Sequence, residues 1–254
     1  MADTPYDTLA EVYDWLVWEG LLTPQGSAAA FGDVLDGLQA GSRILDCAAG
    51  TGHLAVGLAL RGFEVVATDA SDAMVQRTRR LAAEHDADLR AVTSTWEQLD
   101  DADWAGTFDA VFCVGNSLTH AAGSEARRAA LRAMAGVLRG DGLLAVTSRN
   151  WERIRERGSR LKVGDQLVER DGRRGLVIYV WTLADGWEQR HELDVAVALI
   201  GDDGAVTTRG ERLSFWPFRH ETLREDLLAA GLQAAASTYE PDVTAYLVTA
   251  RRVA

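Results

Sequence analysis

The stretch Arg43-Ile44-Leu45-Asp46-Cys47-Ala48-Ala49-Gly50-Thr51-Gly52 decides the fold, because an apolar run ends in an acid and passes into a loop of small residues. An apolar segment with helical character, Leu54–Leu60, follows directly. A strand turns into a helix this abruptly only when the loop residues are small, and such a loop lets a ligand lie against backbone N–H groups at the helix N-terminus. The stretch therefore predicts a ligand-binding turn between a buried strand and a helix.

A second acid follows the next predicted strand. The run Phe63–Thr68 predicts another buried strand, and Asp69 stands at its carboxyl end, 17 positions after Gly52. An acid at that place is positioned to accept hydrogen bonds from two ribose hydroxyls. Helix capping explains a single acid of this kind, but it explains two acids on adjacent strands less well. The pair predicts a site for a nucleoside cofactor.

Two classes of nucleoside cofactor use this geometry. The loop fits the Gly-x-Gly-x-x-Ala fingerprint of dinucleotide sites poorly, because Asp46 and Cys47 occupy positions where the strand should run straight into the first glycine. Spaced as Asp46-x-x-x-Gly50-x-Gly52, it resembles motif I of the class I S-adenosylmethionine methyltransferases, with Ala48 where many members have a glycine. The resemblance implies that Asp46 reaches the amino group of S-adenosylmethionine and that the small residues admit its methionine portion.

The rest of the chain predicts an α/β fold. Alternating strands and helices continue after Asp69, as a parallel sheet with helical crossovers requires. From Arg149 to Phe218 the pattern changes to β-like runs separated by Asp-Gly turns, which predicts an antiparallel insertion. We predict one domain, 1–254: a Rossmann-like, mainly parallel seven-stranded sheet with an antiparallel terminal strand, lid helices within 1–40 and a β-rich insertion at 149–218 after the fifth strand. The predicted strands are 89–93, 108–114, 142–147, 166–170, 175–183, 187–198, 206–216, 233–240 and 243–252, and the predicted helices are 72–84, 124–138 and 219–230.

The cysteine content, the length of the apolar runs and the net charge exclude several classes of function. Cys47 and Cys113, the only cysteines, both lie in apolar runs, so neither a disulfide framework nor a thiolate metal site is expected. Met1–Pro5 lacks the basic region of a signal peptide, and no apolar run approaches the roughly 20 residues of a membrane span, so a cytoplasmic protein is expected. A net charge of −12 argues against nucleic-acid and anionic-membrane partners. A small-molecule acceptor is the expected partner, and a homo-oligomer is left open.

The segment Phe108–His120 resembles glycine and glycine/sarcosine N-methyltransferases, in which the same strand ends in Gly-Asn-Ser and a histidine follows. Further segments align with that family in order, so the resemblance covers nearly the whole chain. They are Asp69-Ala70-Ser71, Thr95-Trp96, Arg149-Asn150-Trp151-Glu152 and Leu213-Ser214-Phe215-Trp216-Pro217-Phe218.

The resemblance implies methyl transfer to the nitrogen of a small amine, amino acid or amino-acid-derived metabolite, with S-adenosylmethionine as cofactor and no metal. In-line displacement chiefly requires a positioned neutral amine. Arg149 would clamp a substrate carboxylate, Asn116 would hold the amine through its side-chain carbonyl, and His120 would orient the amine or take up a proton. Alternatively, Arg149 pairs with an acid and His120 has no chemical role. The predicted cofactor-binding residues are Tyr6, Tyr13, Asp46, Ala48, Gly50, Gly52, Asp69, Ala70, Thr95, Trp96, Val114 and Gly115.

The aromatic residues near the expected cofactor site each allow two interpretations, one functional and one structural. Trp96 either borders the adenine ring or is only part of the core. Tyr6 and Tyr13 belong to a segment, Tyr6–Trp15, that resembles the lid helix of small-molecule methyltransferases, where aromatic faces could attract the sulfonium. Alternatively, this segment simply packs an apolar face.

The lid departs from the glycine N-methyltransferase pattern. That family carries an arginine for the cofactor carboxylate before the first strand, but Trp18–Ala30 contains none. The lid looks closer to that of antibiotic-tailoring N-methyltransferases, so the acceptor could be larger than glycine. Tailoring C- or O-methylation, an NAD(P)-dependent oxidoreductase and a non-catalytic S-adenosylmethionine-binding regulator remain as alternatives.

Overall fold

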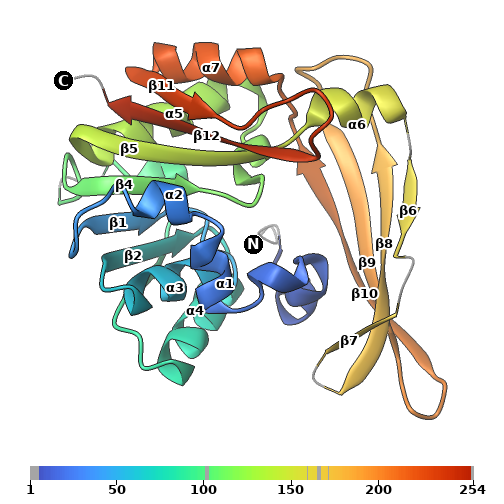
Figure 1. Cartoon of the computed structure of the whole chain (residues 1–254). Helices are drawn as coiled ribbons and strands as arrows, with labels where there is room; N and C mark the ends of the chain where they lie inside the picture. The colour runs from blue at the N-terminus through green and yellow to red at the C-terminus, as the bar shows by residue number, and fades with distance from the viewer. Residues whose placement is uncertain (1–5, 101–102, 159, 165–166, 171, 253–254) are drawn as a thin grey trace.

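The computed structural model describes residues 6–100, 103–158, 160–164, 167–170 and 172–252, and it contains two sheets (Figure 1). Met1–Pro5 of the predicted lid, Gln166 of a predicted strand and the last two residues lie outside the described part. No helix in the described ranges combines the length and apolar character that a membrane span needs.

The main sheet has seven strands in the order β11-β12-β5-β4-β1-β2-β3. The five strands from β3 to β5 in this order pair in parallel, and β12 pairs antiparallel with both β5 and β11. The predicted mainly parallel sheet with an antiparallel terminal strand is thereby confirmed. Because the strand order reverses between β1 and β4, a ligand crevice is expected outside their carboxyl ends. The strands are β1 (Arg43–Asp46), β2 (Glu64–Asp69), β3 (Arg90–Thr93), β4 (Phe108–Cys113), β5 (Leu138–Arg149), β11 (Leu232–Ser237) and β12 (Ala245–Arg252).

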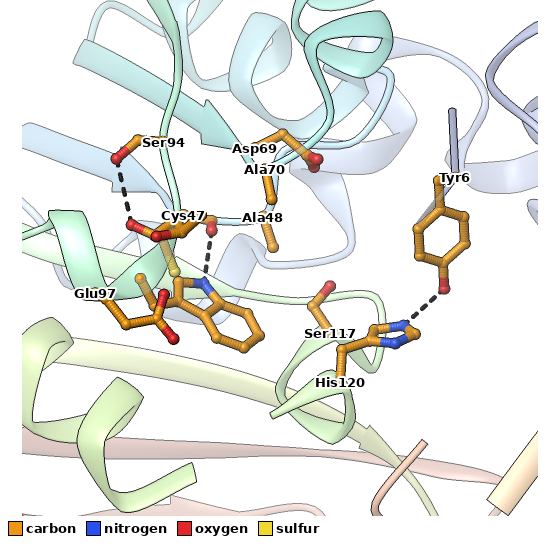
Figure 2. A pocket seen from close by; sticks show the side chains of 11 residues that line it. Tyr6, Cys47, Ala48, Asp69, Ala70, Ser94, Glu97, Ser117 and His120 are labelled. Carbon is orange, nitrogen blue, oxygen red and sulfur yellow. Dashed lines mark hydrogen bonds between the residues drawn. The ribbon is translucent and has the colours of Figure 1, made fainter. Parts of the chain in front are cut away.

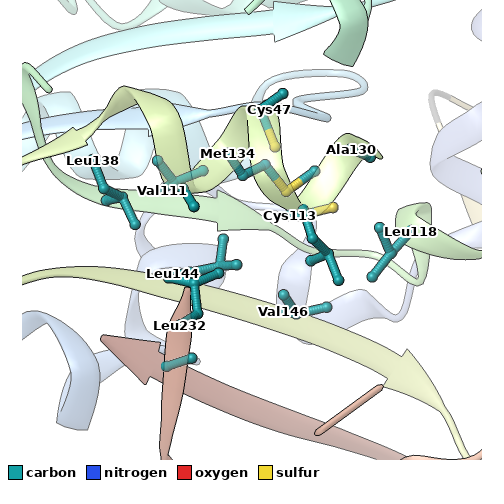
Figure 3. Packing of buried hydrophobic residues seen from close by; sticks show 14 of the residues in the cluster. Cys47, Val111, Cys113, Leu118, Ala130, Met134, Leu138, Leu144, Val146 and Leu232 are labelled. Atoms are coloured by element: carbon teal, nitrogen blue, oxygen red, sulfur yellow. The ribbon is translucent and has the colours of Figure 1, made fainter. Parts of the chain in front are cut away.

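Helices cover both faces of the main sheet. Along β4, Val111 and Cys113 point into the cluster formed with α5 and α7 (Figure 3). Ala110 and Phe112 point to the other face, into the cluster formed with α3. A strand that is buried on both faces is apolar throughout, which is why the sequence predicted the central strands as continuous apolar runs. The covering helices are α3 (His53–Leu60), α4 (Asp72–Glu84), α5 (Gly123–Val137) and α7 (His220–Ala229).

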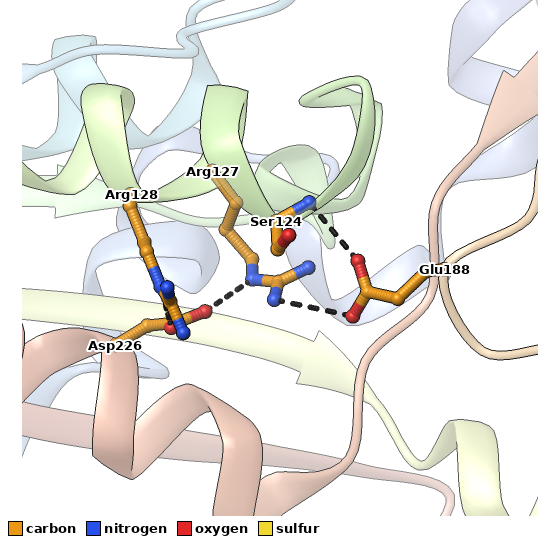
Figure 4. A network of polar contacts seen from close by, with 5 residues as sticks. All are labelled: Ser124, Arg127, Arg128, Glu188 and Asp226. Carbon is orange, nitrogen blue, oxygen red and sulfur yellow. Dashed lines mark hydrogen bonds and ion pairs between the residues drawn. The ribbon is translucent and has the colours of Figure 1, made fainter.

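A buried ion pair joins α5 to α7 (Figure 4). Arg127 Nε donates to Asp226 Oδ2 at 2.7 Å, and both side chains are almost fully buried. Arg128 Nε donates to the other oxygen of Asp226 at 2.6 Å. Glu188, in the insertion, accepts a hydrogen bond from the backbone N–H of Ser124 at 3.0 Å and lies 3.8 Å from Arg127 Nη2. The network therefore connects the insertion to the helices behind the main sheet.

The insertion forms a second, antiparallel sheet, as predicted, and its order is β10-β9-β8-β6 with β7 paired to β8. The strand β6 was not predicted, and the strand expected from Trp187 begins at His191. It begins with a short helix, α6 (Trp151–Arg157), that the sequence analysis missed. The side chain of Asn150 caps α6 by accepting a hydrogen bond from the backbone N–H of Arg153, and Gly158 ends it in a left-handed conformation. The strands are β6 (Leu161–Val163), β7 (Val168–Arg170), β8 (Arg173–Thr182), β9 (His191–Ile200) and β10 (Val206–Phe215).

The N-terminal segment lies between the two sheets (Figure 1). Leu9, Val12 and Trp15 are buried against the insertion sheet, so the packing alternative describes one side of this segment correctly. The predicted lid helix is a 3-10 helix, η1. The elements of this region are η1 (Ala10–Leu16), η2 (Glu19–Leu21), α1 (Pro24–Ala29) and α2 (Gly32–Leu35).

Polar contacts fasten the same segment to the main sheet. Ser71 Oγ donates to Asp7 Oδ1 at 2.5 Å, and Arg77 on α4 donates to Asp14 at 2.5 Å and to the carbonyl of Ala10. The segment is thus held from both sides over the carboxyl ends of β1 and β2.

Candidate active site

Two adjoining cavities lie over the carboxyl edge of the main sheet. The first, of about 260 Å³, is bounded by the loops after β1, β2 and β3 and by Tyr6 and His120 (Figure 2). The second, of about 490 Å³, lies over the loops after β1, β4 and β5. Ala48 and Ser117 line both, so the two cavities form one trough across the point where the strand order reverses. This is where an α/β sheet of this topology binds its ligand.

Asp46, the last residue of β1, presents an unpaired oxygen at this trough. Its side chain is buried and lines the second cavity, and its Oδ1 accepts a long hydrogen bond of 3.5 Å from the backbone N–H of Ala48. Its Oδ2 is buried and has no hydrogen-bond partner in the part of the chain that the structure describes. Burial raises the pKa of the Asp46 carboxyl to about 7. A buried carboxylate oxygen without a donor is costly, so this arrangement is suited to a cationic donor from a ligand.

Asp69, at the end of β2, holds the motif loop in place and lines the first cavity. Its Oδ2 accepts the backbone N–H of Gly50 and its Oδ1 accepts that of Ser71, both at 2.9 Å. Burial raises the pKa of this carboxyl as well. Each carboxylate oxygen can accept more than one hydrogen bond. Asp69 therefore retains acceptor capacity for a diol in the first cavity.

The loop after β3 forms a flat wall of the first cavity (Figure 2). The indole N–H of Trp96 donates to the carbonyl of Cys47 at 2.9 Å, which fixes the ring against the motif loop. Trp96 is half-buried, and Ala70, Ser94 and Thr95 line the cavity beside it. This wall offers an aromatic ring and small residues, which suits a planar ring such as a purine.

Tyr6 and His120 close the first cavity from the lid side. His120 Nδ1 lies 2.9 Å from the carbonyl of Ser214, so this nitrogen carries the proton and Nε2 is the acceptor for the hydroxyl of Tyr6, 2.8 Å away (Figure 2). Burial lowers the pKa of His120 to about 4. The imidazole is therefore neutral near pH 7 with both nitrogens engaged, and it positions Tyr6 instead of serving as a free base.

Tyr13 lines the second cavity, beside the motif loop, and its ring meets that of Tyr6 edge to face at 5.5 Å. Burial raises the pKa of Tyr13 to about 12, so the phenol stays neutral. The two lid tyrosines thus present neutral aromatic rings to the trough, one to each cavity.

The hydrogen bonds of Asn116 differ from the one that was expected for it. Its side-chain Oδ1 accepts the backbone N–H of Arg149 at 3.0 Å and the indole N–H of Trp151 at 3.1 Å, while its Nδ2 donates to Thr119 at 2.9 Å. Both lone pairs of the carbonyl oxygen are therefore directed to protein donors. Asn116 lines the second cavity but joins the ends of β4 and β5, and this structural use replaces the expected contact of its carbonyl with an amine.

Arg149, the last residue of β5, lines the second cavity with an exposed side chain. Within the described part of the chain no carboxylate pairs with its guanidinium, which lies 5.8 Å from the ring centre of Trp181. The alternative that Arg149 is neutralised by one of the chain's many acids does not describe this structure. A free guanidinium beside the trough is suited to a carboxylate ligand.

Of the predicted cofactor-binding residues, Gly52 alone lines neither cavity. It adopts φ +90°, and a Cβ atom there would lie 2.8 Å from the Cα atom of Thr78 on α4. Gly52 therefore permits the left-handed turn into α3 and the close approach of α4. The first cavity receives Tyr6, Ala48, Asp69, Ala70, Thr95, Trp96 and His120, and the second receives Tyr13, Asp46, Ala48, Gly50, Val114, Gly115, Asn116 and Arg149.

Gly52→Ala should lower the free energy of unfolding by about 2–5 kcal/mol, because a strained backbone adds to an overpacked contact. Gly62→Ala is the matched control, since Gly62 has φ +87° but no described residue has an atom within 4 Å of its Cβ position. It should cost only the backbone strain, about 1–2 kcal/mol. Urea unfolding of both variants measures the difference, and equal losses would mean that the contact with Thr78 contributes nothing.

The sequence analysis did not assign a role to Ser117, which lines both cavities and donates its hydroxyl to the carbonyl of Val114 at 2.6 Å. Its place in the Gly-Asn-Ser segment was the available signal. Trp18 and Ala245 also line the second cavity, and no local pattern marked either of them. In the described residues, no group of three or more His, Cys, Asp or Glu side chains could hold a metal ion.

Comparisons with known proteins agree with this arrangement. Residues 44–142 match the family model described as a methyltransferase domain. The chain is 39% identical over 150 residues to a glycine/sarcosine N-methyltransferase of Parasynechococcus marenigrum, an alignment that covers 58% of this chain and 53% of that protein. It is 32% identical over 188 residues to the glycine N-methyltransferase of Rattus norvegicus, covering 69% and 64%. The chain thus spans about half the length of the first of these relatives.

Solved structures share the fold over the whole chain. The methyltransferase CcbJ of Streptomyces caelestis has a TM-score of 0.77 at 22% identity, covering 98% of this chain and 97% of its own. CalS10 of Micromonospora echinaspora, an amino pentose methyltransferase solved with S-adenosylmethionine, has a TM-score of 0.76 at 20% identity and covers all of both chains. At these identities the similarity shows the fold alone.

Proposed function

We propose that the chain is a class I S-adenosylmethionine-dependent methyltransferase that methylates the amino nitrogen of a small amino acid or related amine, in line with the methyltransferase domain that it matches and the N-methyltransferases that it resembles. The observation that carries the proposal is the pairing of two features in one trough. Among the residues that the structure describes, an unpaired carboxylate oxygen of Asp46 lies at the cofactor side of the trough, and a guanidinium without a carboxylate partner, that of Arg149, lies at its other side. One suits the ammonium of a cofactor, and the other suits the carboxylate of an acceptor.

We assign S-adenosylmethionine to the trough, where the residues present fit its functional groups. The orphaned oxygen of Asp46 would accept its amino group, and Asp69 would accept its ribose hydroxyls, while Trp96 would border its purine. When bound, this cofactor supplies an electrophilic methyl group on a positively charged sulfur. The neutral rings of Tyr6 and Tyr13 face the trough and would favour that charge.

The acceptor side of the trough needs only to hold and orient the acceptor. Arg149 would hold the carboxylate, and Asn116 would fix the backbone of Arg149 through the hydrogen bond at its N–H. The hydroxyl of Tyr6 donates to His120 and keeps its lone pairs for an amine hydrogen. Orientation of a neutral amine with water excluded then accounts for the catalysis.

The state of His120 favours nitrogen over a phenol or carbon acceptor. Those acceptors generally require a base, but His120 is neutral, has a lowered pKa and has both nitrogens engaged. An amine is already nucleophilic once it has lost a proton to water. C- or O-methylation thus receives no support from the residue that the sequence analysis considered for it.

Asp69→Ala should weaken the binding of S-adenosylmethionine and S-adenosylhomocysteine by about 1.5–3 kcal/mol, or roughly 10- to 150-fold, because hydrogen bonds to a charged carboxylate are lost. Asp72→Ala is the matched control, since Asp72 starts α4 three positions away, bonds to Thr93 and lines neither cavity. Isothermal titration calorimetry measures both variants. Unchanged affinity in Asp69→Ala, or preferential binding of NAD by the wild type, would remove the basis of the proposal.

The acceptor is found by screening amines and amino acids. Incubation with S-adenosylmethionine should yield an acceptor heavier by one or more methyl groups, together with S-adenosylhomocysteine, as detected by mass spectrometry. Tight cofactor binding without turnover across the library would instead support a regulator. A product methylated on oxygen or carbon would refute the assignment to nitrogen.

A further inference from the structure

A third cavity, of about 750 Å³, lies on the far side of Arg149 between α6, β6 and β8. It shares Trp18, Arg149 and Ala245 with the second cavity, so the two are neighbours with Arg149 at their boundary. Its volume is in the range of about 300–1,000 Å³ that is typical of sites for ligands of drug size. The amino acid glycine would leave such a space unused.

Four cationic side chains line this cavity: Arg149, Arg153, Arg157 and Lys162. Arg153 and Arg157 are four positions apart on α6, so they share one face of the helix, and Lys162 comes from β6. No Asp or Glu within the described ranges lines the cavity, and none pairs with any of the four. This concentration of positive charge occurs in a chain whose net charge is −12.

Aromatic side chains line the same cavity, and Tyr179 on β8 is the register partner of Lys162 on β6. Tyr179 and Trp181 are two positions apart on β8, so both side chains project from the same face of the insertion sheet. The exposed Trp18, from the N-terminal segment, lines the cavity beside them. Like charges held close together repel one another, and an anion that binds among them removes that repulsion. An aromatic wall beside clustered guanidinium groups suits an anionic group that is attached through an apolar spacer.

We propose that this cavity binds a second anionic group of the acceptor, a carboxylate or a phosphate, beyond the carboxylate held by Arg149. The acceptor would then be a dianionic amino acid or peptide-like compound instead of glycine. The inference rests on the proposed function for the identity of the ligand as an acceptor, but the anion site itself can be tested without any turnover.

Lys162 makes the binding test direct, because it is the only lysine in the chain. The rate at which an amine-acylating reagent modifies Lys162 is measured by mass spectrometry on the peptide that contains it. The probes are free of amines: the unbranched dicarboxylates from succinate to pimelate, each compared with its monoamide, and the corresponding phosphonocarboxylates. We expect at least one dianion to slow the modification about fivefold or more relative to its monoamide. Better protection by a carboxylate or by a phosphonate identifies the anionic group, and either result supports the site.

Arg157→Gln should abolish this protection, because it removes one of the clustered charges. Arg160→Gln is the matched control, since Arg160 lies three positions away, carries the same charge and does not line the cavity. Protection should persist in Arg160→Gln. No difference between dianions and monoamides in the wild type, or full protection in Arg157→Gln, would overturn the inference.

Steady-state kinetics test whether the proposed anion site binds part of the acceptor. In the wild type, kcat/KM for glutamate or O-phosphoserine should exceed that for glutamine or serine by at least about tenfold, and this ratio should fall in Arg157→Gln but not in Arg160→Gln. Methylation of glycine in preference to every dianionic acceptor would refute the proposal. Protection of Lys162 without methylation of any acceptor would leave the anion site standing and would refute the proposed function instead.

Discussion

Arg149→Gln is expected to lower kcat/KM for a carboxylate-bearing acceptor by about 100-fold, because a charge-assisted contact of about 2–5 kcal/mol is lost. Arg149→Lys keeps the charge but loses the planar fork, so it should lower kcat/KM by roughly tenfold. The effect should appear mainly in the KM of the acceptor if the contact is equally strong in the ground state and the transition state. Steady-state kinetics with the acceptor from the library screen measure both variants.

The acceptor itself provides the control. The wild type should reject the amide or the decarboxylated analogue of its acceptor, and Arg149→Gln should discriminate far less between acceptor and analogue. Calorimetry on the same variants should show unchanged affinity for S-adenosylmethionine. A fall in cofactor affinity with unchanged acceptor selectivity would mean that Arg149 holds the cofactor carboxylate, for which Trp18–Ala30 offers no arginine.

Asp226→Ala should lower the free energy of unfolding by about 3–5 kcal/mol, because it leaves the buried guanidinium of Arg127 with only the longer contact to Glu188 (Figure 4). Two guanidinium nitrogens of Arg127 have no hydrogen bond to any described residue, so the hydrogen bond from Nε to Asp226 is the main compensation for the burial of this side chain. For a domain whose total stability is about 5–15 kcal/mol, this is a large fraction. Urea unfolding measures the loss, and the melting temperature should fall by about 10 °C.

Asp194→Ala is the matched control on the insertion sheet. Asp194 forms two hydrogen bonds with Arg212, at 2.6 and 2.9 Å, but both side chains are exposed. Loss of this pair should cost less than about 1 kcal/mol. The double variant Arg127→Met, Asp226→Leu should recover most of the stability lost in Asp226→Ala, since no buried charge remains unpaired. Similar losses in Asp226→Ala and Asp194→Ala would contradict this account.

Much of the fold was predictable because its pattern is local. Central strands that are covered on both faces appear as apolar runs, and the small residues from Ala48 to Gly52 mark the turn between β1 and α3. The helix α6 escaped prediction because its seven residues are too few for a clear helical period. Its start at Asn150 and its end at Gly158 carried short signals, but these lay within a region dominated by β-like runs.

The placement of the site was predictable for a different reason. The carboxyl ends of parallel strands meet at one edge, so Asp46, Asp69 and Arg149 could be brought to the same trough from sequence. The hydrogen-bond partners of Asn116 and His120 could not be predicted from the sequence. Asn116 binds Trp151, 35 positions away, and His120 meets Tyr6, 114 positions away, and such contacts depend on how the lid and the insertion pack.

The boundary at Arg149 has a consequence for protein engineering. The cofactor side of the trough is built from the loops after β1 to β4, whereas the acceptor side is built largely from residues after β5. Loops can vary while the scaffold that carries them is kept. A library confined to Arg153, Arg157, Lys162 and Tyr179 should therefore change which compounds are accepted without disturbing Asp46 or Asp69. Because these four positions follow one another between α6 and β8, selection can alter them separately from the residues proposed to hold the cofactor.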